Sequence, residues 1–68
     1  MTFGKKLRKI REDKGLTVTE LAEKAHLSQP TISQYENGDR NPHPNMKMAL
    51  ALALGVKPSA LDDDREEE

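Results

Sequence analysis

Residues 16–38 read LTVTELAEKAHLSQPTISQYENG, and this stretch decides the fold. Thr17 and Glu20 have the spacing of a capping box, in which each side chain accepts a hydrogen bond from the other residue's backbone amide. A helix is therefore predicted to begin here. The apolar residues that follow fall on one face of that helix: Leu21, Ala22 and Ala25.

A second helix is predicted directly after the first. His26 and Leu27 interrupt the pattern, and Ser28 can cap the new helix. Pro30 fits into its first turn, where no backbone amide is needed. Asn37-Gly38 is expected to end it. Two short helices joined by a tight turn result.

The two sides of this second helix differ sharply. Ile32 and Tyr35, three residues apart, give it one narrow apolar side. The other side is short and uncharged, and it consists of Gln29, Pro30, Ser33 and Gln34. Such a surface suits the major groove of DNA, because glutamine can bond bidentately to the edge of adenine. Proline there can offer only apolar contact, for instance to a thymine methyl group.

Several motifs in register resemble the lambdoid repressor/Cro (XRE) helix-turn-helix family. They are Leu21-Ala22-x-Lys24, Leu27-Ser28, Ile32-Ser33, Glu36-Asn37-Gly38, Asn41-Pro42 and Ala51-x-x-Leu54-Gly55-Val56. The resemblance covers about residues 5–61. It implies an all-α fold, a compact five-helix lambda-repressor-like DNA-binding domain with the helix-turn-helix at helices 2 and 3.

The resemblance also implies residue roles. Base reading would fall to Gln29, Pro30, Ser33 and Gln34, although the family usually has a polar residue where this chain has Pro30. Phosphate contacts are expected from Thr17, Val18, Thr31, Asn37, Arg40, Lys6 and Arg8. Val18 stands where the family often has glutamine, so its backbone amide would bind the phosphate. A solvated surface role remains the alternative for Gln29, Gln34, Arg40, Lys6 and Arg8.

Two further roles follow from matching the family. A partly buried Arg11–Glu36 pair would tie helix 1 to the recognition helix. His26 stands where the turn often has glycine, so it is expected to carry a positive φ. His26 and His43 are the chain's two histidines, and neither has a carboxylate at a suitable spacing, so no metal or cofactor is expected.

Composition describes a small basic domain with an acidic end. The chain has 68 residues, of which 34% are hydrophobic, and no cysteine, which excludes disulfides. Six of its twelve acidic residues lie in residues 62–68, and the remainder carries ten Lys/Arg against six Asp/Glu, a balance of +4. We expect one domain over residues 1–61 and a disordered tail over residues 62–68.

Three more helices are predicted outside the central stretch. Residues 3–14 form the first, residues 44–54 the fourth, and Pro58 begins a short fifth with Leu61 as the last core residue. The fourth helix has a predicted core stripe of Met46, Leu50, Ala53 and Leu54. Met48 and Leu52 form a second apolar pair on it, which either packs against a second copy or completes the core against helix 1.

These patterns favour a sequence-specific transcriptional regulator, a repressor that binds a pseudo-palindromic double-stranded DNA operator as a homodimer. The alternative is a protein-interaction module, such as an antitoxin, with a protein partner. No enzyme is expected, because residue spacing suggests no catalytic grouping. No membrane span or signal peptide is visible. A cytoplasmic, nucleoid-associated protein of bacterial or phage origin is expected.

Overall fold

Helices account for all the regular structure in residues 2–61, which the computed structural model describes. They are α1 (Phe3–Asp13), α2 (Val18–Ala25), α3 (Gln29–Asn37), α4 (Pro44–Leu54) and the 3-10 helix η1 (Pro58–Leu61). The predicted all-α fold is confirmed. The tail predicted over residues 62–68 lies outside the described residues.

The fifth element corrects the predicted five-helix count, because η1 is a single 3-10 turn and not an α-helix. It has only four residues and begins with Pro58, at a position where no backbone amide is needed. A 3-10 turn closes its hydrogen bonds over three residues, so it fits a segment that is too short for α-helical bonding.

Capping side chains set the start of the first three helices. The Thr2 side chain accepts a hydrogen bond from the Lys5 amide at 3.4 Å. At α2 the predicted capping box is complete, since the Thr17 amide donates to Glu20 Oε1 at 2.8 Å and the Glu20 amide donates to Thr17 Oγ1 at 3.1 Å. Ser28 caps α3 by accepting from the Thr31 amide at 3.3 Å. Each cap satisfies an amide that the helix itself leaves unpaired.

Left-handed residues end α2, α3 and α4. Gly38 and Gly55 follow α3 and α4 with φ of 83° and 72°. His26 ends α2 with φ of 58° and ψ of 42°, as predicted, and it is the one non-glycine residue with positive φ in the described part of the chain. A left-handed conformation costs a residue with a β-carbon about 1 kcal/mol. The turn between α2 and α3 is therefore formed against a local penalty.

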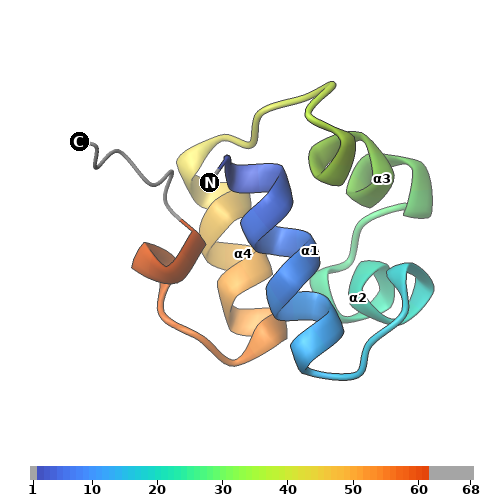
Figure 1. Cartoon of the computed structure of the whole chain (residues 1–68), viewed down its shortest axis with the longest axis vertical. Coiled ribbons are helices and arrows are strands. Elements are labelled where there is room, and N and C mark those ends of the chain that lie inside the picture. Colours follow the sequence, from blue (N-terminus) through green and yellow to red (C-terminus); the bar gives the residue numbers. More distant parts are fainter. Residues whose placement is uncertain (1, 62–68) are drawn as a thin grey trace.

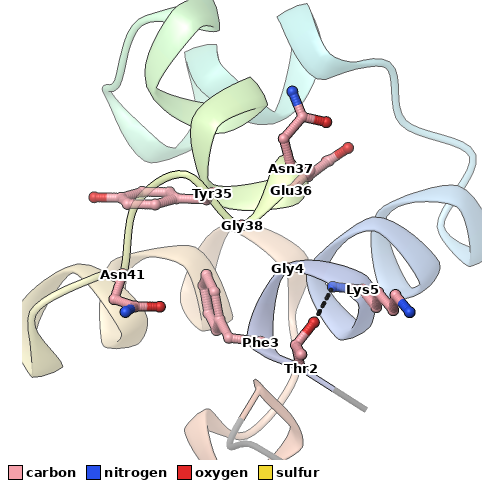
Figure 2. A pocket seen from close by; sticks show the side chains of 9 residues that line it. All are labelled: Thr2, Phe3, Gly4, Lys5, Tyr35, Glu36, Asn37, Gly38 and Asn41. Atoms are coloured by element: carbon pink, nitrogen blue, oxygen red, sulfur yellow. Dashed lines mark hydrogen bonds between the residues drawn. The ribbon is translucent and has the colours of Figure 1, made fainter.

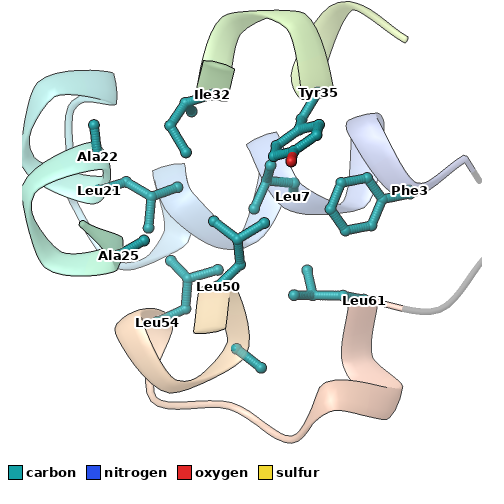
Figure 3. Packing of buried hydrophobic residues seen from close by; sticks show 11 residues of the cluster. Phe3, Leu7, Leu21, Ala22, Ala25, Ile32, Tyr35, Leu50, Leu54 and Leu61 are labelled. Atoms are coloured by element: carbon teal, nitrogen blue, oxygen red, sulfur yellow. The ribbon is translucent and has the colours of Figure 1, made fainter. Parts of the chain in front are cut away.

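A small aliphatic core lies where the helices meet (Figure 3). Its largest fully buried side chains come from all five elements: Leu7, Leu21, Ile32, Leu50 and Leu61. The predicted role of Leu61 as the last core residue is confirmed. In Figure 1, α1 runs through the middle of the view, with α2 and α3 to its right and α4 and η1 to its left. None of the described helices is long and apolar enough to cross a membrane.

The core stripe of α4 differs in part from the predicted one. Leu50 and Leu54 are buried as predicted, but Met46 and Ala53 are only half-buried, whereas Ala51 is fully buried. The reason is that α4 packs against both α2 and η1, and this turns residue 51 inward. The small alanine side chain lets these elements approach closely.

Candidate nucleic-acid interface

The exposed surface of α3 holds all four residues predicted to read bases. Ile32 and Tyr35 are buried against the other helices. Gln29, Pro30, Ser33 and Gln34 are all exposed, and we call these four residues the reading face. The reading face therefore sits on a rigid helix whose opposite side is fixed in the core.

The reading face is electrically neutral. Glu36 is the only charged residue of α3, and its carboxylate is 8% exposed and paired with Arg11. The reading face consequently offers two side-chain amides, a hydroxyl and a proline ring, with no cation among them. This chemistry allows hydrogen bonding and apolar contact with base edges. Without a cation, the reading face cannot neutralise the charge of DNA phosphates.

The Arg11–Glu36 pair attaches α3 to the rest of the fold, as the resemblance implies. Arg11 Nε donates to Glu36 Oε2 at 2.6 Å and Arg11 Nη2 donates to Glu36 Oε1 at 3.1 Å, so the pair is bidentate. Arg11 Nη1 also donates to the Leu16 carbonyl at 2.8 Å. One guanidinium thus joins α1, the segment before α2, and α3.

Burial strengthens the Arg11–Glu36 pair, and it also means that each charge needs the other in place of water. The Arg11 side chain is 11% exposed. Its hydrogen bond to Glu36 raises the pKa of Arg11, and the charges of Glu36 and Glu12 act in the same direction against the opposing effect of burial. Loss of either partner would strand a charge away from water, which is far more costly than loss of a surface ion pair.

The start of α2 presents donors for an anion. The Thr17 hydroxyl oxygen accepts from the Glu20 amide, which leaves its own proton free to donate. Val18 packs its side chain partly against the core, while its amide lies in the first turn, where an α-helix offers no internal partner. The geometry allows the contacts predicted for these two residues.

The remaining predicted phosphate ligands form two groups. Thr31, Asn37 and Arg40 lie on α3 or in the loop after it, and the latter two are exposed. Lys6 and Arg8 lie on α1 instead. Arg8 is exposed, but its Nε is 3.2 Å from Glu12 Oε2. This i,i+4 ion pair was not predicted from the sequence, although the spacing of the two residues indicates it.

A hydroxyl pair at the start of α3 was also missed. The Ser28 Oγ and Thr31 Oγ1 atoms lie 2.8 Å apart and share a hydrogen bond. Thr31 was predicted to contact phosphate, and its hydroxyl is already engaged by the capping residue. Their spacing of three residues at a helix start was the available signal.

Two apolar side chains of α4 are exposed. Met48 is 52% exposed and Leu52 is 80% exposed, and we call this pair the α4 apolar face. The suggestion that they complete the core against α1 is wrong, because α4 turns Leu50, Ala51 and Leu54 inward instead. Within residues 2–61, no group of three or more His, Asp or Glu side chains is placed to hold a metal ion.

Comparison with known proteins identifies the family. The sequence matches the helix-turn-helix family over residues 7–61. It is 39% identical to the immunity repressor protein of Bacillus phage phi105 over 61 residues, which cover 90% of this chain and 42% of that protein. It is 43% identical to the HTH-type transcriptional repressor RghR of Bacillus subtilis over 56 residues, covering 81% of this chain and 42% of RghR. The chain therefore spans less than half of each relative.

Solved structures agree with this assignment. The restriction-modification controller protein C.AhdI from Aeromonas hydrophila superposes with a TM-score of 0.85 and 36% identity, over 87% of this chain and 89% of that one. The N-terminal DNA-binding domain of SinR from Bacillus subtilis gives 0.78 and 29%, over 98% and 97%. A SinR protein/SinI protein complex gives 0.87 and 28%, over 97% and 65%. The chain therefore belongs to the lambdoid repressor/Cro-like (XRE) helix-turn-helix family.

Proposed function

We propose that this chain is the DNA-binding domain of a transcriptional repressor and reads double-stranded DNA with α3 in the major groove. The reading face is the observation that carries the proposal. A helix whose exposed side holds uncharged hydrogen-bonding groups, and whose other side is fixed in a core, is suited to base edges. The relatives and structures named above are described as repressors, controllers or regulators, and none as an enzyme.

Affinity and specificity are divided between separate residues in this proposal. Gln29 and Gln34 bond base edges, Ser33 supplies a further hydroxyl, and Pro30 makes apolar contact. Because the reading face is neutral, phosphate binding falls to its surroundings. The ligands we propose are Thr17, Val18, Thr31, Asn37, Arg40, Lys6 and Arg8. These contacts set the register of α3 on the duplex.

Selection from a random duplex pool, followed by a salt titration, tests the proposal. We expect a preferred sequence to emerge, with an affinity that falls steeply as salt rises. The slope of log K against log salt should be about −0.9 for each phosphate that the protein neutralises. A pool that shows no enrichment, or an affinity that does not respond to salt, would contradict the proposed function.

The α4 apolar face supports a further proposal, that the chain acts as a homodimer on a pseudo-palindromic operator. A two-fold axis places a surface against its own copy, so a charge close to the axis would lie near the same charge of the second copy. Lys47 is the only charged residue of α4, and it lies with Nζ 5.9 Å from the centre of the Phe3 ring. Met48 and Leu52 can therefore meet their copies without repulsion.

The dimer would place two reading faces about 34 Å apart, one turn of DNA. A different polypeptide could occupy the α4 apolar face instead, and one similar structure is a complex between SinR and the protein SinI. Sedimentation of the chain with a full palindrome and with a single half-site separates these cases. Two chains that bind the palindrome cooperatively support the homodimer, whereas independent filling of its two half-sites supports a different partner on this face.

A further inference from the structure

We infer that Gly4 is a positioning residue for DNA reading, because its lack of a side chain sets how closely the end of α3 lies on α1. This inference rests on the proposed function. It predicts that Gly4 controls the contact made by Gln34 far more than the contact made by Gln29. Gly4 itself touches no DNA in this account.

The first turn of α1 meets the end of α3 backbone to backbone. A β-carbon on Gly4 would lie 2.3 Å from the Tyr35 carbonyl oxygen and 2.8 Å from the Glu36 carbonyl oxygen. Figure 2 shows Gly4 beside the end of α3, at the edge of a small pocket. Both obstructing atoms belong to the backbone, so no side-chain rotation can relieve the overlap.

Backbone conformation does not explain this glycine. Gly15, Gly38 and Gly55 have positive φ, but Gly4 lies inside α1 and is not among them. Glycine inside a helix weakens that helix relative to alanine, because it loses more conformational freedom on folding. The remaining reason for glycine at this position is the space that it leaves for α3.

Contacts on both sides of Gly4 attach the same end of α3. The Phe3 and Tyr35 rings meet edge to face, with centroids 5.9 Å apart and planes at 84°. Further along α1, Arg11 holds Glu36. These two contacts and the close approach at Gly4 all act on residues 35 and 36. Gln34 directly precedes them, while Gln29 lies in the first turn, next to the Ser28 cap.

A methyl group at position 4 must push this end of α3 outward. Ordinary contact begins at 3.4 Å, so the Tyr35 carbonyl, which would lie 2.3 Å away, has to retreat by about 1 Å. Binding constellations lose function when their geometry shifts by more than about 0.5 Å. Because Ile32 and the Ser28 cap hold the start of α3, the displacement should be larger at Gln34 than at Gln29.

The experiment compares base-pair preferences across variants on a single half-site. Selection on the wild-type chain defines the preferred half-site, and single base-pair substitutions in it define the discrimination at each position. Gln29→Ala and Gln34→Ala then show which positions each glutamine reads. We expect Gly4→Ala to reduce discrimination about tenfold at the positions lost in Gln34→Ala, and less than about twofold at those lost in Gln29→Ala.

Gly55→Ala is the matched control. Gly55 has φ of 72° and nothing within 4 Å of an added β-carbon, so alanine there strains the backbone without displacing α3. We expect this variant to be less stable and to keep the wild-type discrimination at every position. Melting curves of the free proteins identify a temperature at which both variants are folded.

Phe3→Leu tests the same end of α3 if Gly4→Ala does not fold. It removes the ring that packs against Tyr35 and adds no bulk, and it should also reduce discrimination selectively at the Gln34 positions. Equal losses at the Gln29 and Gln34 positions, or none, in the folded variant would overturn the inference. A wild-type chain with no base preference would instead contradict the proposed function.

Discussion

The helices α3 and α4 both bury an apolar stripe in the core, but α3 exposes polar side chains to solvent and α4 exposes apolar ones. Each buries a narrow apolar stripe, Ile32 and Tyr35 in α3 and Leu50, Ala51 and Leu54 in α4. On the exposed side, α3 carries the neutral polar reading face, whereas α4 carries Met48 and Leu52. Because these side chains are exposed, neither surface contributes packing that stabilises the folded monomer.

The difference indicates two kinds of partner. Side-chain amides gain most from a surface with fixed donors and acceptors, such as the major groove. Exposed apolar side chains gain most from another apolar surface, where both leave water. In the function proposed above, a single short domain would separate DNA recognition on α3 from assembly on α4. The following experiments test whether the two helices have these separate roles.

Arg11→Ala should have the largest effect, because it detaches α3. Removal of one partner of a buried pair costs about 3–5 kcal/mol. A domain of this size has a stability of about 3–5 kcal/mol, so the variant should be largely unfolded at physiological temperature. Thermal melting followed by circular dichroism measures this. Arg8→Ala is the control, because its exposed pair with Glu12 should contribute no more than about 1 kcal/mol. A melting temperature for Arg11→Ala within a few degrees of wild type would argue against the attachment.

Gln29→Ala tests the reading face alone. Loss of a bidentate base contact should weaken binding to the preferred site by about 1–3 kcal/mol and leave binding to random DNA almost unchanged. Titration against both DNAs provides the measurement. Arg40→Ala is the comparison, since a phosphate ligand should weaken both and reduce the salt slope by about 1. Equal losses for Gln29→Ala on both DNAs would show that Gln29 only positions the domain.

Met48→Glu combined with Leu52→Glu tests the α4 apolar face. Both side chains are exposed, so the double variant should remain folded and bind a single half-site as the wild type does. Repulsion across the two-fold axis should remove cooperative binding to the full palindrome, an effect of about 1 kcal/mol or more. Gel-shift titrations on both DNAs measure it. The control, Lys9→Glu, changes the net charge by the same two units at an exposed position of α1. Undiminished cooperativity in the first variant would rule the surface out.

His26→Gly should have the smallest effect and the opposite sign. Glycine removes the left-handed penalty at the turn before α3, and its greater freedom in the unfolded chain offsets part of the gain. We expect a net increase of about 0.5 kcal/mol in the free energy of unfolding, with DNA binding unchanged. Denaturant titration measures the midpoint. An unchanged or lower midpoint would mean that the His26 side chain contributes contacts worth as much as the strain.

Local patterns were enough to predict much of this protein. The capping box of Thr17 and Glu20 and the cap at Ser28 are both formed as predicted. These features depend on residues within about one helical turn of each other, so the amino-acid order determines them directly. The exposed placement of the reading face follows equally from the period of the apolar residues in α3.

Contacts between distant segments were decided only by the tertiary structure. Periodicity in α4 wrongly predicted Met46 and Ala53 in the core stripe, because the helix is apolar on several sides, and packing against α2 and η1 selected Ala51 instead. The same packing left Leu52 in solvent. The proposed role of Gly4 could not be predicted from the sequence either. Its lack of a side chain matters only because α3, some thirty residues further along the chain, packs against it. Periodicity orients a helix toward a core in general, whereas the neighbouring helices determine which residues lie in it.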